Sequence, residues 1–194
     1  MGDQLLVAGL RAGDPNAWEQ LFRRWYPVAY RTAYLITHDA GRAEDAIQEA
    51  FCQAIRKIDS LRRPERLQAW LHVIVSRAAI DQLRRNSGRR DVMVADLEDT
   101  TVPPAVNGWS RTAGQSPEEA VVSGWEAEAV AAALRSLPPQ FRQVTILFYY
   151  HQLSVAEIAA ELGCPEGTVK SRLNRARARL QSMLAPALED RAHG

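Results

Sequence analysis

Apolar residues recur at the spacing of an α-helix along almost the whole of this 194-residue chain. The pattern is widest over residues 42–58, where a single stripe holds Ala43, Ala46, Ile47, Ala50, Phe51, Ala54, Ile55 and Ile58. Side chains three, four and seven positions apart lie on one face of a helix, and such a face is stable only when other elements cover it. The sequence therefore predicts an all-α fold built from helices that pack on one another.

Three further helical segments accompany this stripe in the first part of the chain. Asp14 followed by Pro15 predicts a helix start, because Asp caps free backbone N–H groups and Pro fits the first helical position. Pro27 predicts the beginning of a separate helix, and another is expected from about Pro64 to Arg85. Four helices in this space predict a compact N-terminal bundle over residues 1–88.

The helical periodicity stops between Ser87 and Ser116, where glycines and prolines interrupt the chain. Residues 91–120 hold one Arg against six Asp and Glu, whereas residues 1–90 hold fifteen Lys and Arg against ten Asp and Glu. We predict a flexible acidic linker over residues 89–118. The net charge of +1 hides this asymmetry, so it does not argue against a nucleic-acid partner.

Residues 154–180 carry the most specific local pattern. Ser154 and Glu157 have the spacing of a capping box, in which each side chain accepts a hydrogen bond from the other residue's backbone. Gly163 permits a tight turn, and Pro165 suits the first turn of a second helix. Two short helices joined by such a turn predict a helix-turn-helix, within a C-terminal helical domain over residues 119–188.

The second helix of this motif has one apolar and one polar side. The apolar stripe is expected to hold Val169, Leu173, Ala176 and Leu180. The polar residues expected to face outward are Thr168, Lys170, Ser171, Asn174 and Arg175, with Arg172, Arg177 and Arg179 along the flanks. A basic helix in this motif fits the DNA major groove, and the residues at its start reach base edges. The alternative is a basic helix that is merely solvated.

Two segments of the chain resemble the bacterial sigma factors. Residues 137–180 resemble region 4 of that family through their helix-turn-helix, and residues 43–51 (Ala-Glu-Asp-Ala-Ile-Gln-Glu-Ala-Phe) resemble the core-binding helix of region 2. Residues 69–74 and 79–85 resemble the promoter-melting segment of region 2. Both blocks in this order, with a short linker between them, are similar to the extracytoplasmic-function (ECF) group.

This resemblance implies an alternative sigma factor that binds core RNA polymerase and directs it to promoter DNA. It implies that Asp45, Gln48 and Glu49 dock on the clamp helices of the polymerase's largest subunit. It also implies an anti-sigma factor partner, which in this family covers the same surfaces.

The resemblance further implies two DNA contacts. The downstream (minus-ten) element would meet Arg77, Arg84, Arg85 and Arg89. The upstream (minus-thirty-five) element would meet Thr168, Lys170, Ser171, Arg172, Asn174 and Arg175. Ser76-Arg77 departs from the family's usual basic residue followed by Asn, so Arg77 is expected to contact phosphate rather than a base.

Three other classes of protein are the alternatives. A helix-turn-helix regulator acting without polymerase would explain residues 154–180 but leaves residues 43–51 without a role. An inhibitory protein that keeps the sigma-like blocks is a second alternative. An enzyme is disfavoured, because the four histidines and two cysteines have no metal-ligand spacing and no phosphate loop or nucleophile motif occurs. We therefore expect no catalysis, cofactor or metal, no membrane contact and a cytoplasmic location.

Overall fold

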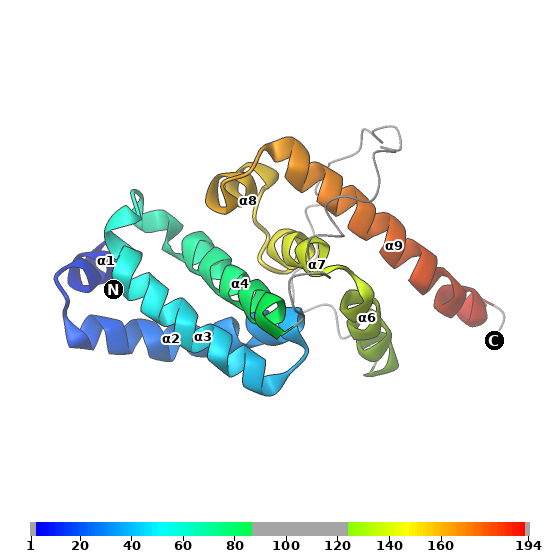
Figure 1. Cartoon of the computed structure of the whole chain (residues 1–194), viewed down its shortest axis with the longest axis horizontal. Coiled ribbons are helices and arrows are strands. Elements are labelled where there is room, and N and C mark those ends of the chain that lie inside the picture. Colours follow the sequence, from blue (N-terminus) through cyan, green and yellow to red (C-terminus); the bar gives the residue numbers. More distant parts are fainter. Residues whose placement is uncertain (1–2, 87–123, 193–194) are drawn as a thin grey trace.

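The computed structural model describes residues 3–86 and 124–192, here called the N-terminal and C-terminal halves. Within these ranges every regular element is helical, which confirms the predicted all-α class (Figure 1). The N-terminal half contains α1 (Asp3–Arg11), α2 (Pro15–Thr37), α3 (Ala40–Lys57), the short 3-10 turns η1 (Ile58–Ser60) and η2 (Pro64–Arg66), and α4 (Leu67–Asn86). The C-terminal half contains α6 (Gly124–Ser136), α7 (Pro139–Thr145), the π-helical turn η3 (Ile146–Tyr150), α8 (Val155–Leu162) and α9 (Glu166–Ala192). The predicted linker, residues 89–118, lies outside the described residues.

The core of the N-terminal half lies between α2, α3 and α4. The stripe predicted over residues 42–58 supplies the α3 side of this core, and Ala43, Ala46, Ile47, Ala50 and Ala54 are buried as expected. Trp70 of α4 is also buried in this core. Small side chains on α3 allow the neighbouring helices to approach closely, and this makes a compact three-helix layer.

The prediction of a separate helix beginning at Pro27 is wrong, because α2 runs unbroken from Pro15 to Thr37. A proline inside a helix removes one backbone hydrogen bond, here the bond to the carbonyl four positions earlier. Both Pro27 and Arg23 lie on the exposed side of α2, so that carbonyl faces water. Burial of the opposite side, including Leu21 and Trp25, stabilises the helix across the missing bond.

The helix α1 was not predicted. It covers one end of the bundle with three buried side chains, Leu6, Val7 and Leu10. Its close approach to α2 depends on Gly9, because a Cβ atom at this position would lie 2.9 Å from the Cβ of Ala17. The segment is short, so its apolar periodicity is too brief to stand out in the sequence.

The two halves pack directly against each other, with α4 beside α7 and α8 (Figure 1). Ala69 and Val73 on α4 are buried together with Val144, Leu147 and Ile158 of the C-terminal half. Phe141, Val144 and Leu147 are buried core residues of the C-terminal half. They lie on α7 and η3, and the π-helical turn of η3 is a feature that the sequence did not indicate.

Candidate nucleic-acid and protein interfaces

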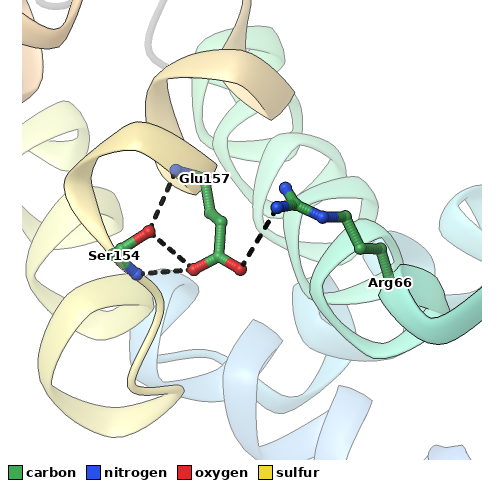
Figure 2. Close-up of polar contacts among 3 residues, drawn as sticks. All are labelled: Arg66, Ser154 and Glu157. Atoms are coloured by element: carbon green, nitrogen blue, oxygen red, sulfur yellow. Dashed lines mark hydrogen bonds and ion pairs between the residues drawn. The ribbon is translucent and has the colours of Figure 1, made fainter. Parts of the chain in front are cut away.

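The helix-turn-helix begins at the predicted capping box (Figure 2). The Ser154 hydroxyl accepts a hydrogen bond from the Glu157 backbone N–H at 3.2 Å, and a Glu157 carboxylate oxygen accepts one from the Ser154 backbone N–H at 2.9 Å. The other carboxylate oxygen lies 4.0 Å from the Arg66 guanidinium, which belongs to the N-terminal half. Glu157 therefore caps α8 and also contacts the other half of the protein.

Replacing Ser154 with alanine is expected to lower the free energy of unfolding by about 1 kcal/mol, because one backbone donor of α8 loses its acceptor. Urea unfolding followed by circular dichroism measures this change. Ser182→Ala is the matched control, since Ser182 lies on the exposed surface of α9 and donates only to the Arg179 carbonyl. Equal free energies of unfolding for the parent and Ser154→Ala would contradict the conclusion that this cap stabilises the protein.

The turn and the second helix of the motif also follow the prediction. Gly163 adopts the left-handed conformation, with φ of 63°, in which a side chain would be strained. Regular helix then begins at Glu166, one position after Pro165. The predicted apolar stripe is confirmed, since Val169, Leu173 and Ala176 are buried and Leu180 is half-buried. This burial fixes which side of α9 faces away from the protein.

The polar residues predicted on α9 all reach the surface. Lys170 and Asn174 are exposed, and Thr168, Ser171, Arg172 and Arg175 are half-exposed. Lys170 forms an ion pair of 3.5 Å with Glu166 one helical turn earlier. Such an exposed pair contributes little to stability, so Lys170 can exchange Glu166 for a phosphate at small cost. The start of α9 is thus a polar, mainly basic surface on a rigid support.

The acidic residues predicted on α3 lie on its exposed side. Asp45 and Gln48 are exposed, and Glu49 is half-exposed. Glu49 accepts a hydrogen bond of 2.9 Å from Gln53 and one of 3.2 Å from Arg56. The Gln53 hydrogen bond, with the charges of Arg56 and Arg85, holds the pKa of Glu49 below its ordinary value. This carboxylate is therefore ionised and oriented at neutral pH, which suits a basic partner.

The arginines predicted to meet the downstream element are separated by the fold. Arg84 and Arg85 are exposed at the end of α4, and Arg84 pairs with Asp81 at 3.6 Å. Arg77 instead donates to the backbone carbonyl of Glu161, at the end of α8. Arg89 lies outside the described residues. Among the described members of this set, Arg84 and Arg85 are thus exposed, whereas Arg77 is half-buried and bound to the Glu161 carbonyl.

Arg142 is a contact residue that the sequence analysis missed. Its guanidinium donates to the backbone carbonyls of Leu134, Arg135 and Leu137, and also to that of Ile36 in the N-terminal half. Burial foremost, with the nearby charge of Arg135, lowers the pKa of Arg142 to about 10, so it remains charged at neutral pH. Every residue has a backbone carbonyl, so no sequence pattern marks these acceptors.

Two histidines that are distant in the sequence meet between the halves. The rings of His72 on α4 and His151, which follows η3, stack with centroids 3.6 Å apart. Beside them the buried Ser76 hydroxyl accepts a hydrogen bond of 3.0 Å from the Gln143 amide. These side chains show that the halves meet through polar contacts as well as apolar ones.

A search of the described residues finds no group of His, Cys, Asp and Glu arranged to hold a metal ion. Among the same residues, no helix is long and apolar enough to span a membrane.

Known protein families match both halves of the chain. The family described as Sigma-70 region 2 matches residues 21–89. The family described as Sigma-70, region 4 matches residues 127–180. The first match contains α3 with its acidic surface and all of α4, and the second contains the helix-turn-helix.

Individual relatives extend the similarity over nearly the whole chain. The ECF RNA polymerase sigma factor SigM of Mycobacterium tuberculosis is 39% identical over 182 residues, which cover 94% of this chain and 84% of that protein. The ECF RNA polymerase sigma-E factor of Escherichia coli K12 is 31% identical over 188 residues, covering 96% of each. In solved structures, the sigma factor RpoE bound to the anti-sigma factor NepR from Bartonella quintana is similar, with 29% identity and a TM-score of 0.57. That similarity covers 86% of this chain and 96% of RpoE.

Proposed function

The chain belongs to the sigma-70 family as an ECF RNA polymerase sigma factor, and from this premise we propose which of its surfaces carry the function. It is an alternative sigma factor, which binds core RNA polymerase and directs transcription initiation. We propose that residues 1–88 and 119–188 are its two functional domains. It acts by binding, without chemistry of its own, in the cytoplasm where polymerase works.

The polymerase-binding surface is formed by Asp45, Gln48 and Glu49 on α3. The supporting observation is that all three side chains reach solvent on the side of α3 opposite its buried alanines. Complementary charge on the polymerase would speed encounter and fix the register of the two partners. A helix-turn-helix regulator would have no use for this surface.

The upstream promoter element is bound by the start of α9. The observation that carries this proposal is the geometry of the motif: a capped α8, a left-handed Gly163, and a buried stripe that turns the polar residues outward. Arg172 and Arg175 are the strongest expected contributors, since a bidentate contact of Arg with guanine contributes about 1–3 kcal/mol of discrimination. Lys170 and Asn174 flank them, and Thr168 and Ser171 complete the set.

The Arg172→Ala and Arg175→Ala holoenzymes are each expected to bind upstream-element duplex about tenfold or more weakly than the parent. The parental holoenzyme first selects its preferred duplex from a randomised library, and the affinities of the variants for that duplex are then measured. Arg23→Ala is the matched control, because Arg23 is an exposed arginine on α2 that pairs with Glu19. Unchanged affinity in both α9 variants would mean that other residues recognise the upstream element.

The downstream element meets the exposed Arg84 and Arg85, together with Arg77 and Arg89. Arginines in such positions neutralise phosphates and carry little base information. Base reading at Ser76 is unsupported, since this side chain is fully buried. Arg77 contributes only after it leaves the Glu161 carbonyl, so promoter melting requires the halves to move apart at α8.

An anti-sigma factor is the proposed inhibitory partner, by analogy with the similar Bartonella quintana sigma factor, whose structure contains one. The partner would compete with polymerase for the surfaces described above. Copurification of the chain with a protein that blocks core polymerase binding would support this proposal.

A further inference from the structure

Three elements bring polar and aromatic side chains together at the boundary between the halves. His72 comes from α4, His151 follows η3, and Trp25 and Thr32 come from α2. The His72 and His151 rings are nearly parallel, with an interplanar angle of 22°. Trp25 meets the edge of His72 at a centroid distance of 5.0 Å, and Thr32 lies 2.8 Å from Nε2 of His151. The histidine pair is thus enclosed by both halves.

Thr32 links His151 to the backbone of α2. Its hydroxyl oxygen lies 2.8 Å from the Val28 carbonyl oxygen and 2.8 Å from Nε2 of His151. When the hydroxyl donates to Val28, it accepts from His151, and the neutral ring then carries its hydrogen on Nε2 and none on Nδ1. An additional proton would make His151 a cation lying against the face of His72.

The surroundings offer such a cation no compensating charge. Burial lowers the pKa of His72 to about 4. Burial and the neighbouring His72 lower the pKa of His151 to about 3. From α2, the guanidinium of Arg31 lies 5.2 Å from the ring of Tyr150, which itself touches His151, so this side of the pair carries a positive charge. Among the described residues, no carboxylate is a cause of either pKa shift.

A third histidine lies at another point of the same boundary. His38 ends α2 in the left-handed conformation, with φ of 53°. Burial, followed by the charges of Arg142 and Arg135, lowers its pKa to about 4. The packed arrangement of the halves thus keeps three histidines neutral.

We propose that the stacked His72 and His151 form an acid-sensitive latch, which holds the two halves of this sigma factor together when neutral and releases them when protonated. This regulation goes beyond the proposed polymerase and promoter binding. The other polar contacts between the halves are those of Arg142 with Ile36, Gln143 with Ser76, Arg77 with the Glu161 carbonyl, and Arg66 with Glu157, and none of these groups titrates in the range where histidine does. Release would free Arg77 from the Glu161 carbonyl and so expose a proposed promoter contact.

The direction of the effect follows from proton binding. A histidine in the separated halves has a pKa of about 6.5, so below this pH the separated state binds protons that the packed state excludes. The stabilisation is therefore complete above pH 6.5 and is lost as the pH falls. For two histidines that become fully solvated on release, the packed-to-separated ratio falls by about 100-fold between pH 7.5 and 5.5.

Fluorescence energy transfer across the full-length protein tests the latch. Donor and acceptor dyes are attached to the exposed Cys52 on α3 and to a cysteine introduced by Ala178→Cys on the exposed side of α9, with Cys164→Ser removing the third thiol. We expect high transfer at pH 7.5 and a reversible loss by pH 5.5, while far-ultraviolet circular dichroism shows unchanged helix content. The sample contains neither polymerase nor DNA, so failure of this experiment leaves the proposed function intact.

Variants that cannot titrate complete the test. His72→Phe keeps an aromatic ring against Trp25 and His151→Gln keeps a donor for Thr32, so the double variant is expected to lose the part of the acid response, about 100-fold, that comes from this pair. His151→Gln alone is expected to reduce the response about tenfold, and it provides the answer if the double variant does not fold. His38→Asn, which tolerates the left-handed conformation, is expected to keep the part that comes from the pair.

Three results of the energy-transfer measurements would overturn the latch, and a fourth comes from circular dichroism. These are low transfer at pH 7.5, transfer that stays constant down to pH 5.5, and an acid response as large in the double variant as in the parent. Loss of helix content together with transfer would also overturn it, because acid would then unfold the protein rather than separate its halves.

Discussion

Asp45→Arg combined with Glu49→Arg is expected to weaken binding to core RNA polymerase by about 100-fold or more. Each substitution replaces attraction by repulsion, and like charges placed together in an interface cost several kcal/mol. The variant should keep its fold, since Asp45 is exposed, Glu49 is half-exposed, and the opposite side of α3 supplies the buried residues. Competition against the labelled parent for core polymerase measures the loss, and circular dichroism verifies the helices.

The matched control for this experiment is Glu19→Arg combined with Asp59→Arg. Both residues are exposed in the same half, and the change in net charge is identical. Normal polymerase binding by this control shows that the site on α3, rather than the overall charge, is responsible. If the parent itself fails to bind core polymerase but binds duplex DNA alone, the α3 assignment is wrong and the chain works as a helix-turn-helix regulator.

Local sequence signals predicted α3, which carries the proposed polymerase-binding surface, and the helix-turn-helix of α8 and α9, which carries the proposed upstream-element surface. The stripe of α3 and the capping box of α8 are patterns of side chains within a few residues of one another, and such patterns act through local geometry. The left-handed Gly163 belongs to the same class, because one residue type fits that backbone conformation without strain. The faces of α3 and α9 that reach solvent then follow from the faces that are buried.

The contacts between the halves could not be predicted from local sequence patterns. The spacing of His72 and His151 in the sequence gives no sign of contact, yet α4 and the end of η3 bring the centroids of their rings to 3.6 Å from each other. Pro27 shows a related limit, because tertiary burial of one side of α2 outweighed a local signal for a new helix. Sequence spacing describes neighbours on one element, whereas these outcomes depend on which elements meet.

The buried guanidinium of Arg142 gives the second large expected effect. Arg142→Met is expected to lower the free energy of unfolding by about 3 kcal/mol or more, because several buried carbonyls lose a charged donor at once. Three of these carbonyls, those of Leu134, Arg135 and Leu137, lie where α6 ends, and cations stabilise the negative end of a helix. Met fills much of the same volume, so the loss comes mainly from the hydrogen bonds.

Arg142→Lys separates the charge of this residue from its geometry. Lysine keeps the positive charge but has its donors on one nitrogen, whereas the guanidinium reaches carbonyls on two sides. We expect Arg142→Lys to restore part of the lost stability while leaving the Ile36 carbonyl without its donor, so energy transfer between the halves should fall even at pH 7.5.

Urea unfolding of both variants, with Arg23→Met as the exposed control, measures the change in the free energy of unfolding. A loss of less than about 1 kcal/mol in Arg142→Met would mean that water replaces the guanidinium at these carbonyls. The contact between the halves would then depend on apolar packing, the histidine pair and the other polar contacts, those of Gln143 with Ser76, Arg77 with Glu161 and Arg66 with Glu157.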